Sequence, residues 1–268
     1  SRGLGDVYKR QNLPIGFIDS GLGGLSVLKE AIKIMPHEDF IYYGDSLNAP
    51  YGTKSVDEIR DLTFAIVDKL LKLGIKGLAV ACNTATSAAV RQLRIMYPDL
   101  TIVGIEPAIK PAVESNHGGE ILVMATPMTI KQEKFNRLLD IYKDRAKIIP
   151  VSCKGLMEFV EHGNLNGSFL EAYFNETLVP YLNDTTETIV LGCTHYPFLR
   201  PYLKEFLGER RIQIIDGSHG TSCELKRQLA GKKLLQKENH EGKVVIKNSM
   251  DEPEMIDLSW KLLNLPID

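Results

Sequence analysis

Long hydrophobic runs are missing from this chain of 268 residues, and so is a strong excess of charge of either sign. No stretch offers the roughly 20 consecutive apolar residues that a membrane-spanning helix needs. Lys and Arg number 32 against 34 Asp and Glu, which leaves a formal net charge of −2. So even a balance gives no electrostatic reason to expect a nucleic acid or a membrane surface as a partner.

Cysteines are few, and none of the four forms a CxxC pair. We therefore expect no zinc site, since Cys193-Thr194-His195 also has the wrong ligand spacing. A hydrophobic content of 44% supplies enough core to make disulfides unnecessary. Residues 1–11 are polar and lack the apolar centre of a signal peptide. We interpret them as a disordered lead-in or remnant outside the fold, and we predict a cytoplasmic protein with free thiols.

Strand-like apolar segments alternate with segments of helical periodicity along the rest of the chain. This alternation predicts an α/β fold with mostly parallel sheets and helices on both faces. The alternation of strand and helix starts again after Glu106-Pro107, and we expect the chain to return to the first unit near Asp216. We therefore predict two pseudo-symmetric three-layer α/β units that face each other across a cleft. The first comprises residues 12–106 plus 216–268, and the second comprises residues 107–215.

Two short stretches, 79–84 and 189–195, look like copies of one pattern. In each, a run of β-forming residues ends at a cysteine, Cys82 or Cys193, and small hydroxyl or amide side chains follow. Such a strand-to-helix corner lies at the carboxyl edge of a parallel sheet, where ligands bind. A thiol there meets backbone N–H groups and the positive end of a helix dipole, which favour a thiolate. We interpret Cys82 and Cys193 as a two-cysteine acid/base pair.

Two thiols suit a reaction that moves a proton from one face of a carbon to the other. Preorganised N–H and hydroxyl donors would then stabilise the carbanion. For a single cysteine, a buried small hydrophobe is the commoner interpretation, and we apply it to Cys153 and Cys223. The glycine turn at 19–24 suits either an anion site or a tight turn capped by Asp19 and Ser20. Further candidates for binding lie at predicted strand ends and loops: Asp19, Ser20, Tyr51, Gly52, Asn83, Thr84, Thr126, Thr194 and His195.

Five motifs carry a family resemblance. They are Asp19-Ser20-Gly21-Leu22-Gly23-Gly24, Pro50-Tyr51-Gly52, Ala81-Cys82-Asn83-Thr84, Gly104-Ile105-Glu106-Pro107-Ala108 and Gly192-Cys193-Thr194-His195-Tyr196-Pro197. Together, and in this order from about residue 14 to 220, they resemble the glutamate racemases of the aspartate/glutamate racemase superfamily. The resemblance implies a cytoplasmic isomerase, commonly a homodimer, that uses neither pyridoxal phosphate nor metal. It also implies that the enzyme supplies D-glutamate for peptidoglycan.

The resemblance implies roles for particular residues. Cys82 and Cys193 would be the acid/base pair, with Asp19 assisting Cys82 and with Glu161 and His195 assisting Cys193. Considered without the family, Glu161 is equally well a solvated helix residue and His195 a helix-start cap. The family often has a proline directly after the cysteine that matches Cys153, where this chain has Lys154. Substrate glutamate would be bound by Asp19, Ser20, Tyr51, Gly52, Asn83, Thr84, Thr194 and His195, with help from Thr126 and Thr129.

Two other functions stay open at this point. One is a racemase of the same superfamily that acts on aspartate, which a side-by-side assay of both amino acids would separate from a glutamate enzyme. The other is a non-catalytic module that binds carboxylate or phosphate at the glycine turn and the helix starts. Such a module would gain stability on binding its ligand but would exchange no substrate hydrogen with solvent.

Overall fold

A computed structural model describes residues 10–237 and 239–267 of the chain. These residues divide into two compact units. The first contains residues 10–105 and 218–264, and the second contains residues 106–217 and 265–267. Some residues expected in the first unit belong to the second: Glu106, Asp216, Gly217 and 265–267. Asp216 does so because it is the last residue of a strand there and pairs with Leu191.

The first unit is built on a five-stranded sheet with the order β4-β3-β1-β2-β9, in which every neighbouring pair is parallel. Its central strands are buried along their whole length, as expected for a parallel sheet that is covered on both faces. Because all pairs are parallel, the carboxyl ends of the strands meet at one edge. The strands are β1 (Ile15–Asp19), β2 (Phe40–Gly44), β3 (Gly77–Val80), β4 (Thr101–Gly104) and β9 (Val244–Asn248).

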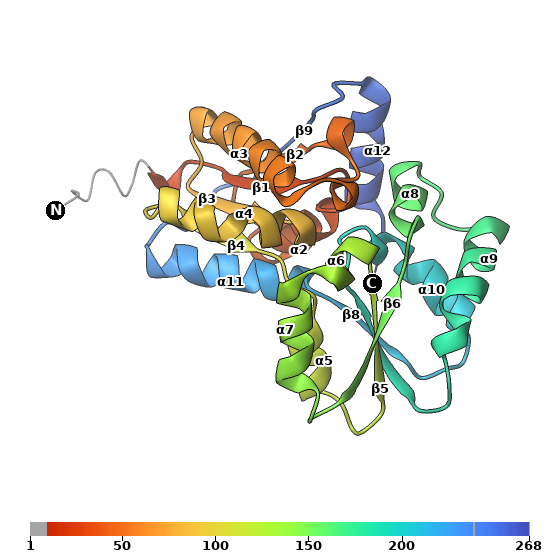
Figure 1. Cartoon of the computed structure of the whole chain (residues 1–268). Coiled ribbons are helices and arrows are strands. Elements are labelled where there is room, and N and C mark those ends of the chain that lie inside the picture. The colour runs from red at the N-terminus through yellow and green to blue at the C-terminus, as the bar shows by residue number, and fades with distance from the viewer. Residues whose placement is uncertain (1–9, 238, 268) are drawn as a thin grey trace. The chain divides into compact units, whose positions relative to one another are not determined.

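Helices cover both faces of this sheet (Figure 1). On one face lie α3 (Val56–Leu73) and α4 (Asn83–Met96), which pack against each other. On the other lie α2 (Leu25–Ile34), α11 (Ser218–Gly231) and α12 (Pro253–Asn264). Two 3₁₀ turns, η1 (Ser46–Asn48) and η2 (Tyr51–Thr53), lie between β2 and α3.

Part of the predicted lead-in belongs to the first unit. Residues 1–9 lie outside the described residues, but Arg10 and Gln11 do not. The Gln11 carbonyl accepts a hydrogen bond of 2.6 Å from the Lys76 ammonium, and the Gln11 side chain donates to the Lys233 carbonyl at 3.0 Å. Lys76 is fully buried and forms an ion pair with the buried Glu38. Our exclusion of residues 1–11 was therefore wrong for these two, because the Gln11 carbonyl helps to satisfy a buried cation and the Arg10 guanidinium donates to the Asp99 carbonyl at 3.5 Å.

The second unit is built on a four-stranded sheet with the order β6-β5-β7-β8, again parallel throughout. On one face, buried residues of α5 (Ile109–Glu114) and α7 (Glu133–Tyr142) form a single apolar cluster with β5 and β7. On the other face, the Phe174 ring of α9 (Ser168–Thr177) stacks on Tyr202 of α10 (Arg200–Leu207), with 6.3 Å between the ring centroids. Figure 1 shows the two helix layers on either side of the sheet. The strands are β5 (Glu120–Ala125), β6 (Lys147–Ser152), β7 (Thr186–Leu191) and β8 (Gln213–Asp216).

The helical segments of the second unit are of unequal length. The ones that cover the sheet are α5 (Ile109–Glu114), α7 (Glu133–Tyr142), α9 (Ser168–Thr177) and α10 (Arg200–Leu207). Short turns follow the strands at the carboxyl edge or join helices: α6 (Pro127–Lys131), α8 (Leu156–Glu161), η3 (Val179–Tyr181) and η4 (Tyr196–Leu199). The prediction of an α/β fold with two mostly parallel sheets is confirmed.

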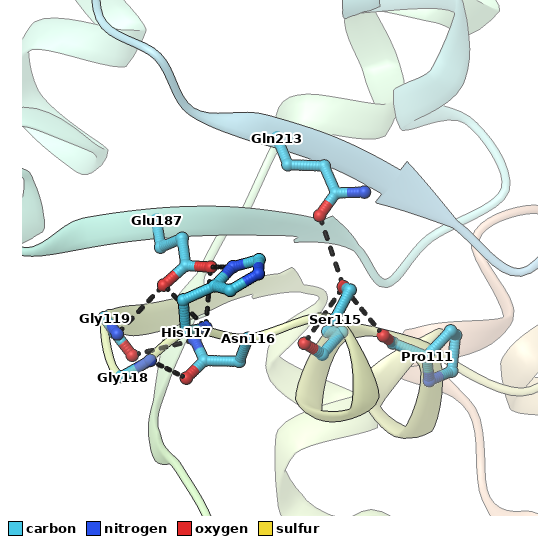
Figure 2. A network of polar contacts seen from close by, with 9 residues as sticks. Pro111, Ser115, Asn116, His117, Gly118, Gly119, Glu187 and Gln213 are labelled. Atoms are coloured by element: carbon cyan, nitrogen blue, oxygen red, sulfur yellow. Dashed lines mark hydrogen bonds and ion pairs between the residues drawn. The ribbon is translucent and has the colours of Figure 1, made fainter.

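The opposite edge of this second sheet is held by a polar network (Figure 2). The carboxylate of Glu187 accepts hydrogen bonds from the backbone N–H groups of His117 and Gly119, and it contacts His117 Nδ1 at 2.9 Å. These bonds hold the pKa of Glu187 below its usual value, with the His117 ring as the main cause. The network fixes the loop that leads into β5, away from the strand ends that carry the cysteines.

No helix among residues 10–237 and 239–267 is long and apolar enough to cross a membrane.

Candidate active site

Cys82 lies at the end of β3, where the chain turns into α4. The residue is only 6% exposed, and it occupies the N-cap position of α4. Its sulfur accepts a hydrogen bond from the Ala85 N–H, and its thiol donates to Ser20 Oγ, both at 3.5 Å. The cysteine thus takes the place that Ser or Asp usually has at a helix start. Its sulfur meets the positive end of α4 and one hydroxyl group.

Asp19 and the glycine turn lie at the end of the neighbouring strand β1. One Asp19 oxygen accepts a hydrogen bond of 3.0 Å from the Gly21 N–H, so the carboxylate caps the turn. A Cβ at Gly24 would lie 2.7 Å from Asp19 Cβ and 2.9 Å from Ala81 Cβ. Only a glycine there lets α2 begin this close to the ends of β1 and β3. Close packing at the strand ends therefore accounts for this glycine.

Tyr51 is held by a carboxylate that sequence reasoning missed. Its hydroxyl donates a hydrogen bond of 2.7 Å to Asp45, whose two oxygens also accept from the Asn48 amide at 3.0 and 3.1 Å. Tyr51 and Asp45 are 2% and 3% exposed. Burial raises the pKa of Tyr51 far above its usual value, and the Asp45 carboxylate adds to this, so the phenol stays protonated. Asp45 directly follows β2, and this position at a strand end could have identified it as a candidate site residue.

The remaining predicted residues of the first unit lie in the same region of the sheet edge. Asn83 and Thr84 form the first turn of α4 and are 9% and 6% exposed. Gly52 lies in η2 next to Tyr51. The first unit therefore brings its predicted residues to the carboxyl ends of β1, β2 and β3, or to the segments that directly follow them.

Cys193 follows β7 in the second unit and is partly exposed. The chain reaches it through Gly192, whose N–H donates a hydrogen bond of 2.7 Å to the Met124 carbonyl of β5. A Cβ at Gly192 would lie 2.7 Å from that same carbonyl oxygen. Only a glycine therefore allows β7 to stay paired with β5 up to the cysteine.

A histidine and a carboxylate continue from Cys193. The sulfur lies 3.6 Å from His195 Nδ1, and His195 Nε2 lies 2.6 Å from a Glu161 oxygen at the end of α8. His195 is 2% exposed, and the Glu161 side chain is 13% exposed. Burial acts to lower the pKa of His195, but the contacts with Cys193 and Glu161 outweigh it, and the pKa lies well above its usual value. A thiol, a base and an orienting carboxylate in series are a recurring arrangement in enzymes.

The other strand ends of the second unit add hydroxyl groups and a second thiol. Thr126 follows β5, and its Oγ1 accepts a hydrogen bond of 3.2 Å from the Thr129 N–H and lies 3.0 Å from the Thr129 hydroxyl. Thr194 is buried. Cys153 follows β6, and burial, with a smaller effect of Cys193, raises its pKa to about 12. Cys153 therefore remains a buried thiol, whereas Cys223 is exposed on α11 and our expectation of burial was wrong for it.

Among the described residues, no group of three or more His, Cys, Asp or Glu side chains has the arrangement of a metal site.

Comparison with known proteins defines the class of this chain. A profile of the family described as Asp/Glu/Hydantoin racemase matches residues 16–219. The chain belongs to this family, as its motifs predicted.

Individual relatives of the chain are named glutamate racemases. The chain is 54% identical over 252 residues to a glutamate racemase of Clostridium botulinum, covering 94% of this chain and 97% of the relative. The structure resembles a glutamate racemase isoform of Bacillus anthracis with a TM-score of 0.84, at 30% identity over 96% of both chains. It also resembles the Francisella tularensis glutamate racemase in complex with D-glutamate, with a TM-score of 0.81, at 25% identity over 95% of both chains.

Proposed function

We propose that this chain is a glutamate racemase, which interconverts L-glutamate and D-glutamate without a cofactor. Support comes from relatives of that name at 54% and 50% identity over nearly the whole chain. A solved relative at 25% identity is in complex with D-glutamate. Aspartate is the alternative substrate, since the family includes both amino acids by its description. Assays of both amino acids with the same enzyme preparation would decide, and we expect activity with glutamate.

One observation carries the chemical proposal: each unit ends a buried parallel strand in a cysteine with proton-handling neighbours. In the proposed reaction, one sulfur as a thiolate removes the α-proton of glutamate and becomes a thiol. The other sulfur, initially a thiol, delivers its proton to the opposite face of the α-carbon and becomes a thiolate. The C–H bond that breaks and the one that forms lie on opposite faces, so the centre is inverted. The reverse reaction exchanges the two roles.

The two cysteines would be served by different partners. For Cys82 these are the Ser20 hydroxyl, which accepts from its thiol, and Asp19 on the adjacent strand end. For Cys193 the partner is His195, which Glu161 orients. A protonated His195 can return a proton to Cys193, and the Glu161 carboxylate stabilises the imidazolium. General acid/base catalysis of this kind contributes about 10² to 10⁴-fold to rates.

Stabilising the carbanion and holding the substrate would fall to the polar groups at the strand ends. N–H and hydroxyl donors that are already aligned bind developing negative charge without reorganising. We assign the carboxylates of glutamate to donors and its ammonium group to the Asp19 carboxylate. The residues proposed to bind substrate are Asp19, Ser20, Tyr51, Gly52, Asn83, Thr84, Thr126, Thr194 and His195.

Circular dichroism tests the proposal directly, by following the conversion of L-glutamate to D-glutamate with a chelator present and no cofactor added. We expect activity in the wild type and none in Cys82→Ala or Cys193→Ala. Cys223→Ala is the matched control, because its thiol lies on the exposed surface of α11. Full activity in either of the first two variants would overturn the two-cysteine mechanism.

Exchange of the substrate α-hydrogen in deuterated water distinguishes this enzyme from a non-catalytic binding module. A racemase incorporates deuterium at the α-carbon, whereas a module that only binds glutamate gains stability and exchanges nothing.

We further propose that the enzyme works in the cytoplasm as a homodimer and supplies D-glutamate for peptidoglycan. The four free cysteines are in keeping with a reducing compartment. Rescue of a bacterial strain that requires D-glutamate tests the cellular role, and sedimentation tests the dimer.

A further inference from the structure

Another histidine–carboxylate pair also has a cysteine beside it, and it lies outside the proposed active site. On α11, the Cys223 sulfur lies 3.4 Å from His219 Nε2, and the two residues are one helical turn apart. His219 Nδ1 lies 2.9 Å from a Glu30 oxygen on α2, which packs against α11. Cys223 is exposed, the His219 side chain is 73% exposed, and the Glu30 side chain is 24% exposed. A nucleophile, a base and an orienting carboxylate therefore stand in series on an open surface.

Two lysines lie on the same pair of helices. Lys33 of α2 lies 3.7 Å from the second Glu30 oxygen, and Lys226 is one turn beyond Cys223 on α11. The Lys226 ammonium donates a hydrogen bond of 3.0 Å to the Ile34 carbonyl at the end of α2, which keeps it on this side of α11. Reactive thiols in proteins are those that are exposed and close to His or Lys.

Two other sites in the chain each have only part of this arrangement. His117 and Glu187 form a histidine–carboxylate pair of the same 2.9 Å length, but no cysteine belongs to that network (Figure 2). Cys153 is a cysteine without exposure, and burial holds it as a thiol. Of these three places, only α11 combines the pair with an accessible sulfur.

We propose that Cys223 is a modification site that reacts with low-molecular-weight disulfides. His219 takes the thiol proton, and the Cys223 thiolate attacks one sulfur of the disulfide. A new S–S bond forms between Cys223 and that sulfur while the original S–S bond breaks. The second sulfur leaves as a thiolate and receives the proton from His219. Cys223 is oxidised and the disulfide is reduced, so atoms, electrons and protons balance.

The test measures how fast 4,4′-dithiodipyridine modifies each cysteine of the full-length protein, with the sites resolved by peptide mass spectrometry. We expect Cys223 to react faster than a cysteine in a short unstructured peptide. His219→Asn should slow Cys223 by about tenfold, because it loses the base. Glu30→Gln should slow it less, because the ring remains. His117→Asn is the matched control and should leave Cys223 unchanged.

The dependence of this rate on pH separates an acid/base role from a structural one. In the wild type, the reaction of Cys223 should reach its plateau at a lower pH than in His219→Asn. Equal rates and equal profiles in the two proteins would overturn the proposal, as would a rate no faster than that of the peptide. Cys193→Ala should leave the reactivity of Cys223 unchanged. The result for Cys223 therefore does not depend on whether the chain is a racemase.

Discussion

The corner that carries Cys82 and the corner that carries Cys193 follow one plan with different partners. In each, a buried parallel strand ends and the next residues begin a helical turn. Cys82 is enclosed, caps a full helix and contacts a hydroxyl group. Cys193 is partly exposed, is followed by the 3₁₀ turn η4 before α10 begins, and contacts a buried imidazole.

This difference concerns how each corner can handle a proton. At Cys82, the Ala85 N–H and the start of α4 can stabilise negative charge on the sulfur. In the proposed mechanism, the same task at Cys193 falls to His195 and Glu161, which would store and return a proton. Two strand ends of the same design thus place the two cysteines in chemically different surroundings.

The largest effect should come from removing either sulfur. Cys82→Ser and Cys193→Ser should each lower kcat in both directions by about 10³-fold or more, since each proton transfer then lacks its acid/base group. Equal losses would mean that the two corners are equally necessary despite their different partners. Initial rates from L-glutamate and from D-glutamate provide the measurement, with Cys223→Ser as the control.

Adding one methyl group at Gly192, next to Cys193, should mainly affect folding. Gly192→Ala puts a Cβ 2.7 Å from the Met124 carbonyl, a backbone atom that cannot turn away. We expect a loss of about 2–4 kcal/mol in the free energy of unfolding, measured by urea denaturation.

Gly24→Ala is the matching change near Cys82, because the added Cβ would be too close to the side chains of Asp19 and Ala81. Glycines with open space around them, such as Gly220, supply the control. A Gly192→Ala variant as stable as Gly220→Ala would show that the second corner can widen freely.

Glu161→Gln should impair the second corner alone. Without the carboxylate, the imidazolium of His195 loses its stabilising partner, and we expect kcat to fall about 10- to 100-fold. Steady-state kinetics measure this fall. A drop in substrate affinity with kcat unchanged would instead assign Glu161 to binding.

The same variant predicts a dependence of stability on pH. Because the pKa of His195 is raised in the folded protein, its contribution is complete below the ordinary histidine pKa of about 6.5. That contribution is lost as the pH rises through the folded value. The unfolding free energies of wild type and Glu161→Gln should therefore differ most near pH 6 and converge in alkaline solution. A gap that widens with pH would contradict this assignment.

The smallest effect should come from changing Tyr51. Tyr51→Phe removes the hydrogen bond to Asp45 but keeps the ring, and we expect a loss of about 1 kcal/mol in unfolding free energy. Asp45→Asn keeps an acceptor for Tyr51 and should cost less than Asp45→Ala. Thermal unfolding measures all three, and an unchanged Tyr51→Phe would mean that Asn48 alone secures Asp45.

Local sequence signals were sufficient where the determining interactions lie within a few residues. Ser55-Val56-Asp57-Glu58 is an example, because the Ser-x-x-Glu pattern of a capping box lies within four residues and the structure has both of its hydrogen bonds. The alternation of strand and helix segments likewise predicted the parallel sheets, because apolar periodicity reports which face of each element is buried. The short α5 and the 3₁₀ turns gave no such periodic signal.

Signals failed where a contact depends on how separate elements meet. Cys223 was expected to be buried, but Ser222 and Leu225 face the interior and leave the cysteine outside. A single helical turn of sequence does not report which side packs on α2. Asp45 was overlooked for a related reason, since its importance arises only when the following loop folds back and brings the Tyr51 hydroxyl to it.

The amino-acid order was enough to establish the α/β class, the racemase family and the positions of two cysteines at strand ends, because these depend on local periodicity and contiguous motifs. Folding in three dimensions alone decided the neighbours of each sulfur. Glu161 and His195 are 34 residues apart, and they meet because α8 follows β6 while His195 follows β7 in the same sheet. Distance along the chain carries no record of such a meeting, which depends on the order in which the strands pair.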